Sequence, residues 1–433
     1  MTPTTHSLSI RPARAVRGTL RVPGDKSISH RYVLLGAIAH GATTITNLAP
    51  GQDVAATVQA VRTLGVEVDR HGAGEIRVTG RGLAAFHPPA VPIDAANSGT
   101  TMRLLAGVLA GGPVRVTLTG DASLQRRPMQ RVIEPLTAMG GRLTAAAGRP
   151  PIDIEGMPLH AIDWRMAAPS AQVKSAVLLA ALAATGTTRV HEPAATRDHT
   201  ERAFPAFGLA LDAEDGWLAV RGGQRPIAPP RPLRAAGDPS SAAVWACAAA
   251  ALPGSSVTIE GVSLNPRRLA WAGVLERMGA RIEMGADAGD AGEPTGWIRV
   301  SHEAHRAATI SPAEVPGLID ELPALAARAA LGAGLEVSGA SELRVKESDR
   351  ITALVTGLRG LGVSAEERAD GFAIDGTTPP SGGQADAAHD HRLVMTFALV
   401  ALGARGPSVV TGADAVAVSY PDFAQDLERL TIR

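Results

Sequence analysis

The stretch Val22-Pro23-Gly24-Asp25-Lys26-Ser27 returns near the middle of the chain as Ala235-Ala236-Gly237-Asp238-Pro239-Ser240, and an alanine-rich segment follows each copy. In both copies an aspartate stands just before apolar residues, which predicts the start of a helix. Because the two copies lie about half a chain apart, we interpret the protein as two homologous halves.

A shorter pattern repeats within each half. It consists of a polar turn, an alanine- and leucine-rich helix, a β-branched strand, a second helix and a short strand. The first copy predicts helices at 26–39 and 54–64 and a strand at 43–48, and further strands are predicted at 114–119, 187–191, 256–260, 335–338 and 408–411. Second helices are predicted to end at Met139-Gly140, Phe207-Gly208, Met278-Gly279 and Leu361-Gly362, where glycine can adopt the left-handed conformation. A period of roughly 70 residues, longer than solenoid repeats, indicates compact α/β units packed around an axis, three in each half.

The sixth copy is incomplete, because its first helix is predicted at 391–402 and the chain ends before a closing strand. We expect the extended stretches at 8–10 and 19–22 to complete the C-terminal half. The sequence therefore predicts one domain from residues 1–20 plus 236–433 and an inserted second domain from residues 21–235, with a hinge and a substrate cleft between them.

The composition narrows the function. The 433 residues exceed what one core usually serves, and 42 basic residues against 42 acidic ones give a formal net charge of zero. This balance argues against nucleic acid or a membrane surface as a partner. Arg11 and Arg14 interrupt the place of a secretory signal, and the apolar runs are shorter than the roughly 18 residues of a membrane span. We expect a cytoplasmic protein.

Cysteine and histidine give little support for metal or thiol chemistry. The single cysteine, Cys247, lies in a predicted alanine-rich helix, so we interpret it as a core residue and not as a nucleophile. The pairs His302/His305 and His389/His391 lack a further identifiable ligand and are interpreted as surface or loop histidines. We expect no metal and no cofactor.

Cations stand where predicted helices begin. Lys26, Ser27 and Arg31 open the first helix, whereas the mid-chain copy has Pro239 and Val244 at the places of the two cations, so the fold itself does not require them. Ser27 and Arg31 share one helical face, and a helix N-terminus attracts anions. We predict an anion site here; the alternative is an N-cap serine followed by a solvated arginine.

The arrangement recurs. Asn97-Ser98-Gly99-Thr100 precedes Arg103, and Ser170-Ala171-Gln172 precedes Lys174. The second helices add cations near their starts, at Arg126, Arg127, Arg197, Arg344, Lys346 and Arg350. If these helix ends converge on one cleft, the guanidinium groups there can bind phosphate and carboxylate bidentately.

Three carboxylates are candidates for acid–base chemistry. Asp320 and Glu321 precede a predicted helix at 322–331, and for Asp320 taken alone a helix-cap role is favoured. Glu347 lies between Lys346 and Arg350, where it is either a salt-bridge partner or a proton carrier.

Four segments together resemble the family of 5-enolpyruvylshikimate-3-phosphate synthases, and they occur in the family's order over nearly the whole chain: residues 23–31, 97–100, 344–350 and 390–392. The resemblance implies an α/β fold of two similar domains, each of three βαβαββ units in an inside-out α/β barrel. It also implies transfer of the enolpyruvyl group of phosphoenolpyruvate to the 5-hydroxyl of shikimate 3-phosphate. That addition–elimination reaction belongs to the shikimate pathway of aromatic amino acid biosynthesis, and we expect a monomer.

The resemblance also assigns residues. The implied shikimate 3-phosphate contacts are Lys26, Ser27, Arg31, Ser170, Ala171, Gln172, Arg197, Asp320 and Lys346. The implied phosphoenolpyruvate contacts are Lys26, Gly99, Arg127, Gln172, Arg350 and Arg392. Asp320 is implied as the base on the 5-hydroxyl, and Glu347, with Lys26, as the acid at C3 of phosphoenolpyruvate.

The chain departs from the family at three places. Val418 stands where many members have a lysine, Ala171 where some have serine, and Glu342 where some have asparagine. The departures put single contacts in doubt, not the reaction.

Two alternatives remain open. A UDP-N-acetylglucosamine enolpyruvyl transferase shares the donor, but most members carry a reactive cysteine on a mobile loop, where Cys247 does not lie. A repeat-built scaffold without catalysis would leave Lys26, Arg31, Arg127 and Arg350 unexplained.

Overall fold

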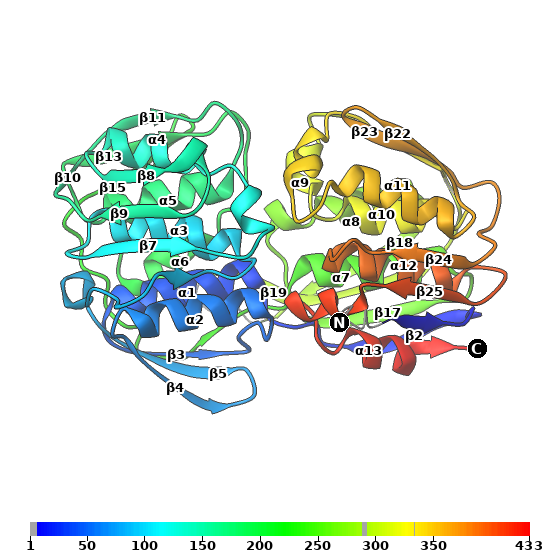
Figure 1. The fold of residues 1–433 in the computed structure, drawn as a ribbon. Coiled ribbons are helices and arrows are strands. Elements are labelled where there is room, and N and C mark those ends of the chain that lie inside the picture. The colour runs from blue at the N-terminus through cyan, green and yellow to red at the C-terminus, as the bar shows by residue number, and fades with distance from the viewer. Residues whose placement is uncertain (1–6, 288–291, 333) are drawn as a thin grey trace. The chain divides into compact units, whose positions relative to one another are not determined.

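A computed structural model describes residues 7–287, 292–332 and 334–433 of the chain (Figure 1). It contains two compact units. Unit 1 comprises Met1–Pro23, Gly237–Gly289 and Pro294–Arg433, and unit 2 comprises Gly24–Ala236 and Asp290–Glu293.

Unit 2 contains three four-stranded sheets with the same design. Their strand orders are β16 (Leu233–Arg234)-β3 (His40–Thr46)-β5 (Glu75–Arg81)-β4 (Glu67–Gly72), β6 (Ile93–Asp94)-β7 (Arg115–Thr119)-β9 (Ile152–Glu155)-β8 (Arg142–Ala145), and β11 (Asp163–Arg165)-β13 (Thr187–His191)-β15 (Trp217–Arg221)-β14 (Asp212–Glu214). In each sheet the first pair is parallel and the other two pairs are antiparallel. A short parallel pair, β10 (Leu159–His160) and β12 (Ala184–Thr185), accompanies them.

Two helices accompany each of these sheets: α1 (Lys26–Ile38) and α2 (Gln52–Thr63), α3 (Gly99–Ala110) and α4 (Gln130–Ala138), and α5 (Ala171–Ala181) and α6 (His199–Ala203). The first helix of each pair is buried on nearly all sides, and α1 and α5 bury charged side chains, Arg31 and Lys174, together with apolar ones. Figure 1 shows α1, α3 and α5 inside the unit, with strands around them. A Cβ atom at Gly107 would lie 2.2 Å from the carbonyl oxygen of Ala176, so α3 and α5 pack with their backbones in contact.

Unit 1 has three related sheets, of five, four and three strands. Its sheets are β18 (Ala280–Ala286)-β19 (Thr295–His302)-β17 (Ser256–Ser263)-β2 (Ala15–Leu20)-β26 (Thr431–Ile432), β20 (Ala308–Ile310)-β21 (Leu335–Val337)-β23 (Gly371–Asp375)-β22 (Ser364–Arg368), and β1 (Leu8–Ile10)-β25 (Ser408–Thr411)-β24 (Gly383–Asp386). Its helices are α7 (Pro239–Ala251), α8 (Ala270–Arg277), α9 (Val315–Leu318), α10 (Leu322–Ala330), α11 (Arg350–Gly360), α12 (His391–Leu402) and α13 (Phe423–Leu430).

The N-terminal strands complete unit 1, as the incomplete sixth copy predicts. β1 pairs antiparallel with β25, and β2 pairs parallel with β17. Of the extended stretch predicted at 19–22, only residues 19 and 20 lie in a strand, at the end of β2 (Ala15–Leu20).

The fold class predicted from the repeat is confirmed: each unit has mixed α/β content with recurring helix and strand pairs. The strands at 187–191 and 408–411 and the helix at 391–402 have the predicted bounds. No helix among the described residues is long and apolar enough to span a membrane.

Two exposed glycines allow a test of the backbone. Gly208 ends the second helical segment of its copy with φ of 69°, in the left-handed region, whereas Gly273 lies inside α8. A Cβ atom added at either glycine would have no other atom within 4 Å, so alanine at either place meets no neighbour.

We predict opposite effects of alanine at these glycines. Gly208→Ala should lower the free energy of unfolding by about 1 kcal/mol, because a left-handed backbone disfavours a side chain. Gly273→Ala should raise it by about 0.5 to 1 kcal/mol, because alanine favours a helix. Urea unfolding followed by circular dichroism measures both, and equal effects would contradict the assigned conformations.

Candidate active site

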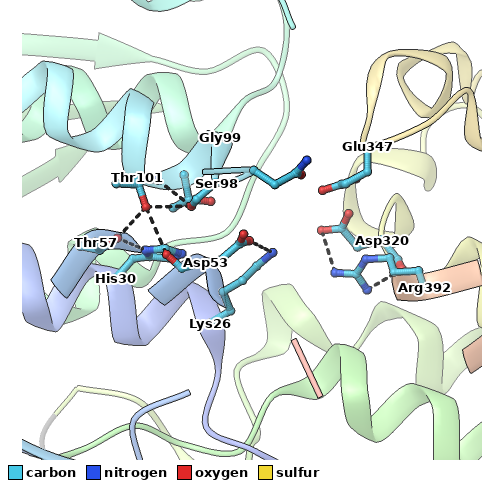
Figure 2. Close-up of polar contacts among 12 residues, drawn as sticks. Lys26, His30, Asp53, Thr57, Ser98, Gly99, Thr101, Asp320, Glu347 and Arg392 are labelled. Carbon is cyan, nitrogen blue, oxygen red and sulfur yellow. Dashed lines mark hydrogen bonds and ion pairs between the residues drawn. The ribbon is translucent and has the colours of Figure 1, made fainter. Parts of the chain in front are cut away.

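Lys26 is the first residue of α1, and an ion pair fixes its ammonium group. Asp25 caps the helix by accepting a hydrogen bond from the amide of Ile28. The Nζ atom of Lys26 lies 2.8 Å from a carboxylate oxygen of Asp53, which is 6 % exposed and stands in the first turn of α2 (Figure 2). Sequence reasoning did not select Asp53, because an acidic residue in the first turn of a helix is common for its favourable interaction with the helix dipole.

Arg31 lies one turn further along α1 and is buried. Its guanidinium donates hydrogen bonds to Thr200 Oγ1 at 2.7 Å, to Ser175 Oγ at 2.7 Å and to the carbonyl oxygen of Ser27 at 2.8 Å. Burial lowers the pKa of Arg31 to about 10, which leaves it charged at neutral pH. Because Asp25 is the helix cap, the alternative of an N-cap serine followed by a solvated arginine is wrong.

The start of α3 brings two arginines close to a glycine. Ser98 is the N-cap and accepts a hydrogen bond from the amide of Thr101. A Cβ atom on Gly99 would lie 2.7 Å from Nη1 of Arg103 and 3.3 Å from Nη1 of Arg127, so only glycine leaves both guanidinium groups in place.

Two side-chain bridges hold these arginines. Arg127 donates to the side-chain oxygen of Asn97, and Arg103 donates to Oε1 of Gln172 at 2.6 Å. The side-chain nitrogen Nε2 of Gln172 donates to Thr100 Oγ1 at 2.9 Å, which links the start of α5 to that of α3. Arg103 is absent from the implied substrate contacts, although it stands one turn after the predicted cap.

The start of α5 has the predicted cap, but its predicted cation is buried and already paired. Ser170 is the N-cap, and Ala171 is the first helical residue. Lys174, expected as a cation near an anion, is fully buried and pairs with Glu201 at 2.7 Å and with Glu192 at 3.1 Å. That expectation is wrong, because two carboxylates of the unit already surround its charge.

Arg197 lies in the loop before α6 and is partly exposed. Its positive charge contributes to lowering the pKa of Arg31, so the two arginines of unit 2 are close enough to interact electrostatically. We call the basic residues and helix-start residues of this unit that are expected at the substrates the unit 2 cluster. Its members are Lys26, Ser27, Arg31, Gly99, Arg127, Ser170, Ala171, Gln172 and Arg197.

Asp320 lies among three cations of unit 1. Its carboxylate oxygens are 3.7 Å from Nη2 of Arg392, 3.8 Å from Nη1 of Arg350 and 3.9 Å from Nζ of Lys346. Arg392 also donates to the carbonyl oxygen of Asp320 at 2.8 Å (Figure 2). The favoured helix-cap role for Asp320 is wrong, because α10 begins at Leu322 and its N-cap is the next residue, Glu321.

Arg350 joins the remaining carboxylates of this site. It is fully buried, donates through Nε to Asp390 at 2.8 Å and through Nη2 to Glu347. Burial alone would lower the pKa of Arg350, but the carboxylates of Asp390, Glu347 and Asp320 raise it. Glu347 is therefore a salt-bridge partner of Arg350, which leaves its role as a proton carrier to be proposed.

Lys346 differs from its neighbouring arginine. Its side chain is 29 % exposed, and burial nevertheless lowers the pKa of its ammonium group, against the opposing effect of Asp320. We call Asp320, Lys346, Glu347, Arg350 and Arg392 the unit 1 cluster.

The described residues include no exposed thiol and no cluster of potential metal ligands. Cys247 lies inside α7, fully buried, and burial raises the pKa of its thiol, as expected of a core residue. No group of three or more His, Cys, Asp or Glu side chains that could hold a metal ion occurs in the part of the chain that the structure describes.

His30 is a buried histidine of α1 beside the Lys26 pair. Its Nδ1 atom lies 2.6 Å from Thr57 Oγ1. Burial lowers the pKa of His30 from 6.5 to about 3, so the imidazole is neutral in the folded chain at neutral pH.

This shift predicts acid sensitivity. Below pH 6.5 the unfolded chain takes up a proton at His30 that the folded chain refuses until about pH 3, so stability is lost as the pH falls through this window. Between pH 7 and pH 4 the wild type should lose about 3 kcal/mol more than a His30→Asn variant. Urea unfolding at both pH values measures the difference, and parallel losses would contradict the burial of a neutral imidazole.

Comparison of the sequence with known proteins places these clusters in context. The family model of EPSP synthase (3-phosphoshikimate 1-carboxyvinyltransferase) matches residues 10–427. A 3-phosphoshikimate 1-carboxyvinyltransferase of Acidithiobacillus ferrooxidans is 48 % identical over 96 % of this chain and 95 % of its own length. The enzyme of the same name from Halorhodospira halophila is 46 % identical over 97 % of this chain and 95 % of its own.

Solved structures agree with the sequences. An EPSP synthase from Acinetobacter baumannii superimposes with a TM-score of 0.87 at 38 % identity, over 99 % of both chains. The enolpyruvyl transferase NikO from Streptomyces tendae has a TM-score of 0.79 at 18 % identity, over 98 % of both chains, which shows a shared fold.

Proposed function

The chain belongs to the EPSP synthase (3-phosphoshikimate 1-carboxyvinyltransferase) family, and we propose that the unit 1 and unit 2 clusters carry out its reaction. The reaction transfers the enolpyruvyl group of phosphoenolpyruvate to the 5-hydroxyl of shikimate 3-phosphate and releases phosphate, by addition and elimination through a tetrahedral intermediate. It is a step of the shikimate pathway of aromatic amino acid biosynthesis.

The other two functions are not favoured. Relatives at 46 % and 48 % identity carry the name of the shikimate enzyme, not of the UDP-N-acetylglucosamine enzyme. Cys247, the single cysteine of the chain, is buried inside α7, whereas most members of that second family carry a reactive cysteine on a loop. A scaffold without catalysis does not fit a chain whose relatives are named as transferases over nearly their full length.

The substrate contacts are proposed from both clusters. For shikimate 3-phosphate they are Lys26, Ser27, Arg31, Ser170, Ala171, Gln172, Arg197, Asp320 and Lys346, and for phosphoenolpyruvate they are Lys26, Gly99, Arg127, Gln172, Arg350 and Arg392. Three helix starts and five arginines offer amide and guanidinium donors of the kind that bind phosphate and carboxylate groups. The proposal therefore draws on both predicted domains, 1–20 plus 236–433 and 21–235, for one substrate pair.

The carboxylates are proposed to move the protons. Asp320 would accept the proton of the 5-hydroxyl as that oxygen attacks C2 of phosphoenolpyruvate, while Glu347, with Lys26, would supply a proton to C3. The observation that carries this proposal is the position of Asp320 within 4 Å of three cations, which can hold an anionic substrate next to the base. In the second step phosphate leaves the tetrahedral adduct.

Val418 stands where many family members have a lysine. We propose that Arg350 and Arg392 provide enough positive charge to bind phosphoenolpyruvate without it. We also propose that the protein is a cytoplasmic monomer, and that the reaction needs no metal or cofactor.

The carboxylate roles can be tested by phosphate release from phosphoenolpyruvate and shikimate 3-phosphate in the presence of a chelator. Asp320→Asn and Glu347→Gln keep the side-chain shape and remove the proton-carrying group, so each should lower kcat by about 10² to 10⁴. Glu366→Gln, which changes a carboxylate with 68 % exposure on β22, is the matched control and should leave kcat unchanged.

Each outcome of this assay is informative. Wild-type release that requires both substrates supports the assigned reaction, and release with UDP-N-acetylglucosamine in place of shikimate 3-phosphate would overturn it. Full activity of Asp320→Asn would remove that residue from the proposed mechanism.

A further inference from the structure

A chain of buried polar side chains links the starts of α1, α2 and α3 (Figure 2). The Nδ1 atom of His30 lies 2.6 Å from Thr57 Oγ1, which lies 2.6 Å from Thr101 Oγ1. The hydroxyl of Thr101 then lies 2.8 Å from Ser98 Oγ and 3.3 Å from the carbonyl oxygen of Asp53. The four side chains that form it, His30, Thr57, Thr101 and Ser98, are all 0 % exposed.

The fold alone does not require this hydrogen-bonded chain. The mid-chain copy of the pattern has Ala243 in α7 at the place of His30, and that alanine is equally buried. Burying an imidazole and hydroxyl groups costs free energy unless each finds a partner, so a purely structural position favours apolar residues. A role in holding other groups in place would explain why polar side chains occupy these positions.

The proton positions give the hydrogen-bonded chain a direction. The Nε2 atom of His30 has no hydrogen-bond partner among the described residues, and a buried donor without an acceptor costs more than a buried acceptor without a donor. The neutral ring therefore carries its proton on Nδ1 and donates to Thr57, which donates to Thr101. The single hydroxyl proton of Thr101 is in turn shared between two acceptors at the far end, the Ser98 hydroxyl at 2.8 Å and the Asp53 carbonyl at 3.3 Å.

The Thr101 end of the hydrogen-bonded chain adjoins two groups that the proposed function uses. The side chain of Asp53 holds the Lys26 ammonium at 2.8 Å, while its backbone accepts from Thr101. Ser98 directly precedes Gly99, the helix start close to Arg103 and Arg127. A shift of either backbone would move a proposed phosphoenolpyruvate contact.

We propose that His30, Thr57 and Thr101 are positioning residues for the transfer reaction. Their hydrogen-bonded chain fixes the backbone of Asp53 and Ser98, and so sets where Lys26 and Gly99 meet phosphoenolpyruvate. This inference rests on the proposed roles of Lys26 and Gly99. It assigns a function to three residues that touch neither substrate.

The central link is the most sensitive place for a test, because Thr57 both accepts from His30 and donates to Thr101. Thr57→Val keeps the shape of the side chain and removes its hydroxyl. Because the displaced groups are proposed to bind phosphoenolpyruvate, we expect its KM to rise about tenfold while kcat changes less than about threefold. Thr57→Ser retains the hydroxyl and should restore the KM to within about twofold of wild type.

Thr43 provides a matched control. It is a buried threonine of β3 in the same unit, 1 % exposed, and its hydroxyl has no hydrogen-bond partner among the described residues. Thr43→Val removes a buried hydroxyl from the same unit without touching the hydrogen-bonded chain. It should leave the KM for phosphoenolpyruvate unchanged.

Steady-state phosphate release with both substrates, together with a melting curve for each variant, decides the question. A raised KM in Thr57→Val, restored in Thr57→Ser and absent in Thr43→Val, supports the proposal. A lowered melting temperature of Thr57→Val without a raised KM overturns it, because the hydrogen bonds would then only stabilise the fold. The pair Thr101→Val and Thr101→Ser repeats the test at the next link if Thr57→Val does not fold.

The wild type separates this inference from the function on which it rests. If the wild type does not turn over the two substrates, the proposed function fails. If the wild type is active and all the valine variants match it, only the positioning role is wrong.

Discussion

The mutual repulsion of like charges is the constraint on which this protein depends. A site for two phosphorylated anions needs several cations close together, and these repel one another before any substrate arrives. Each unit compensates with its own carboxylates: Asp53 holds Lys26 in unit 2, while Asp390 and Glu347 hold Arg350 in unit 1. These ion pairs fix the cations in position in advance, which would lower the reorganisation that the proposed binding and catalysis require.

The repeated fold supplies the places for these charges. Every copy of the pattern presents a helix start, and a helix start attracts anions even without a charged side chain. Lys26 and Arg31 occur in one copy, whereas α7 in unit 1 has the buried apolar residues Pro239 and Val244 at the corresponding places. The same architecture thus serves as packing in one copy and as a candidate binding surface in another. The proposed function therefore depends on the side chains at the helix starts and not on the fold alone.

The repeat made much of the fold predictable, since apolar periodicity and glycine positions recur in each copy. The incomplete sixth copy also predicted that residues 8–10 belong to the C-terminal half, where β1 pairs with β25. Partners distant in sequence were harder to foresee. Lys174, like Arg103, stands about one turn after a helix cap, yet two glutamates from other segments surround it. Asp320 has the sequence context of a helix cap, and only the fold brings three cations to it. Asp53 and Thr101 were missed because an acid or a threonine at a helix start is common for local reasons alone.

The central claim is that both clusters serve one substrate pair, and a crystal structure of the protein with shikimate 3-phosphate bound tests it most directly. The account predicts the 5-hydroxyl within about 3 Å of the Asp320 carboxylate, the reach of a general base. It also predicts contacts of the same ligand with residues of the unit 2 cluster, among them Lys26 and Gln172. A ligand that contacts residues of one unit alone, or a 5-hydroxyl with no carboxylate in reach, would contradict the account.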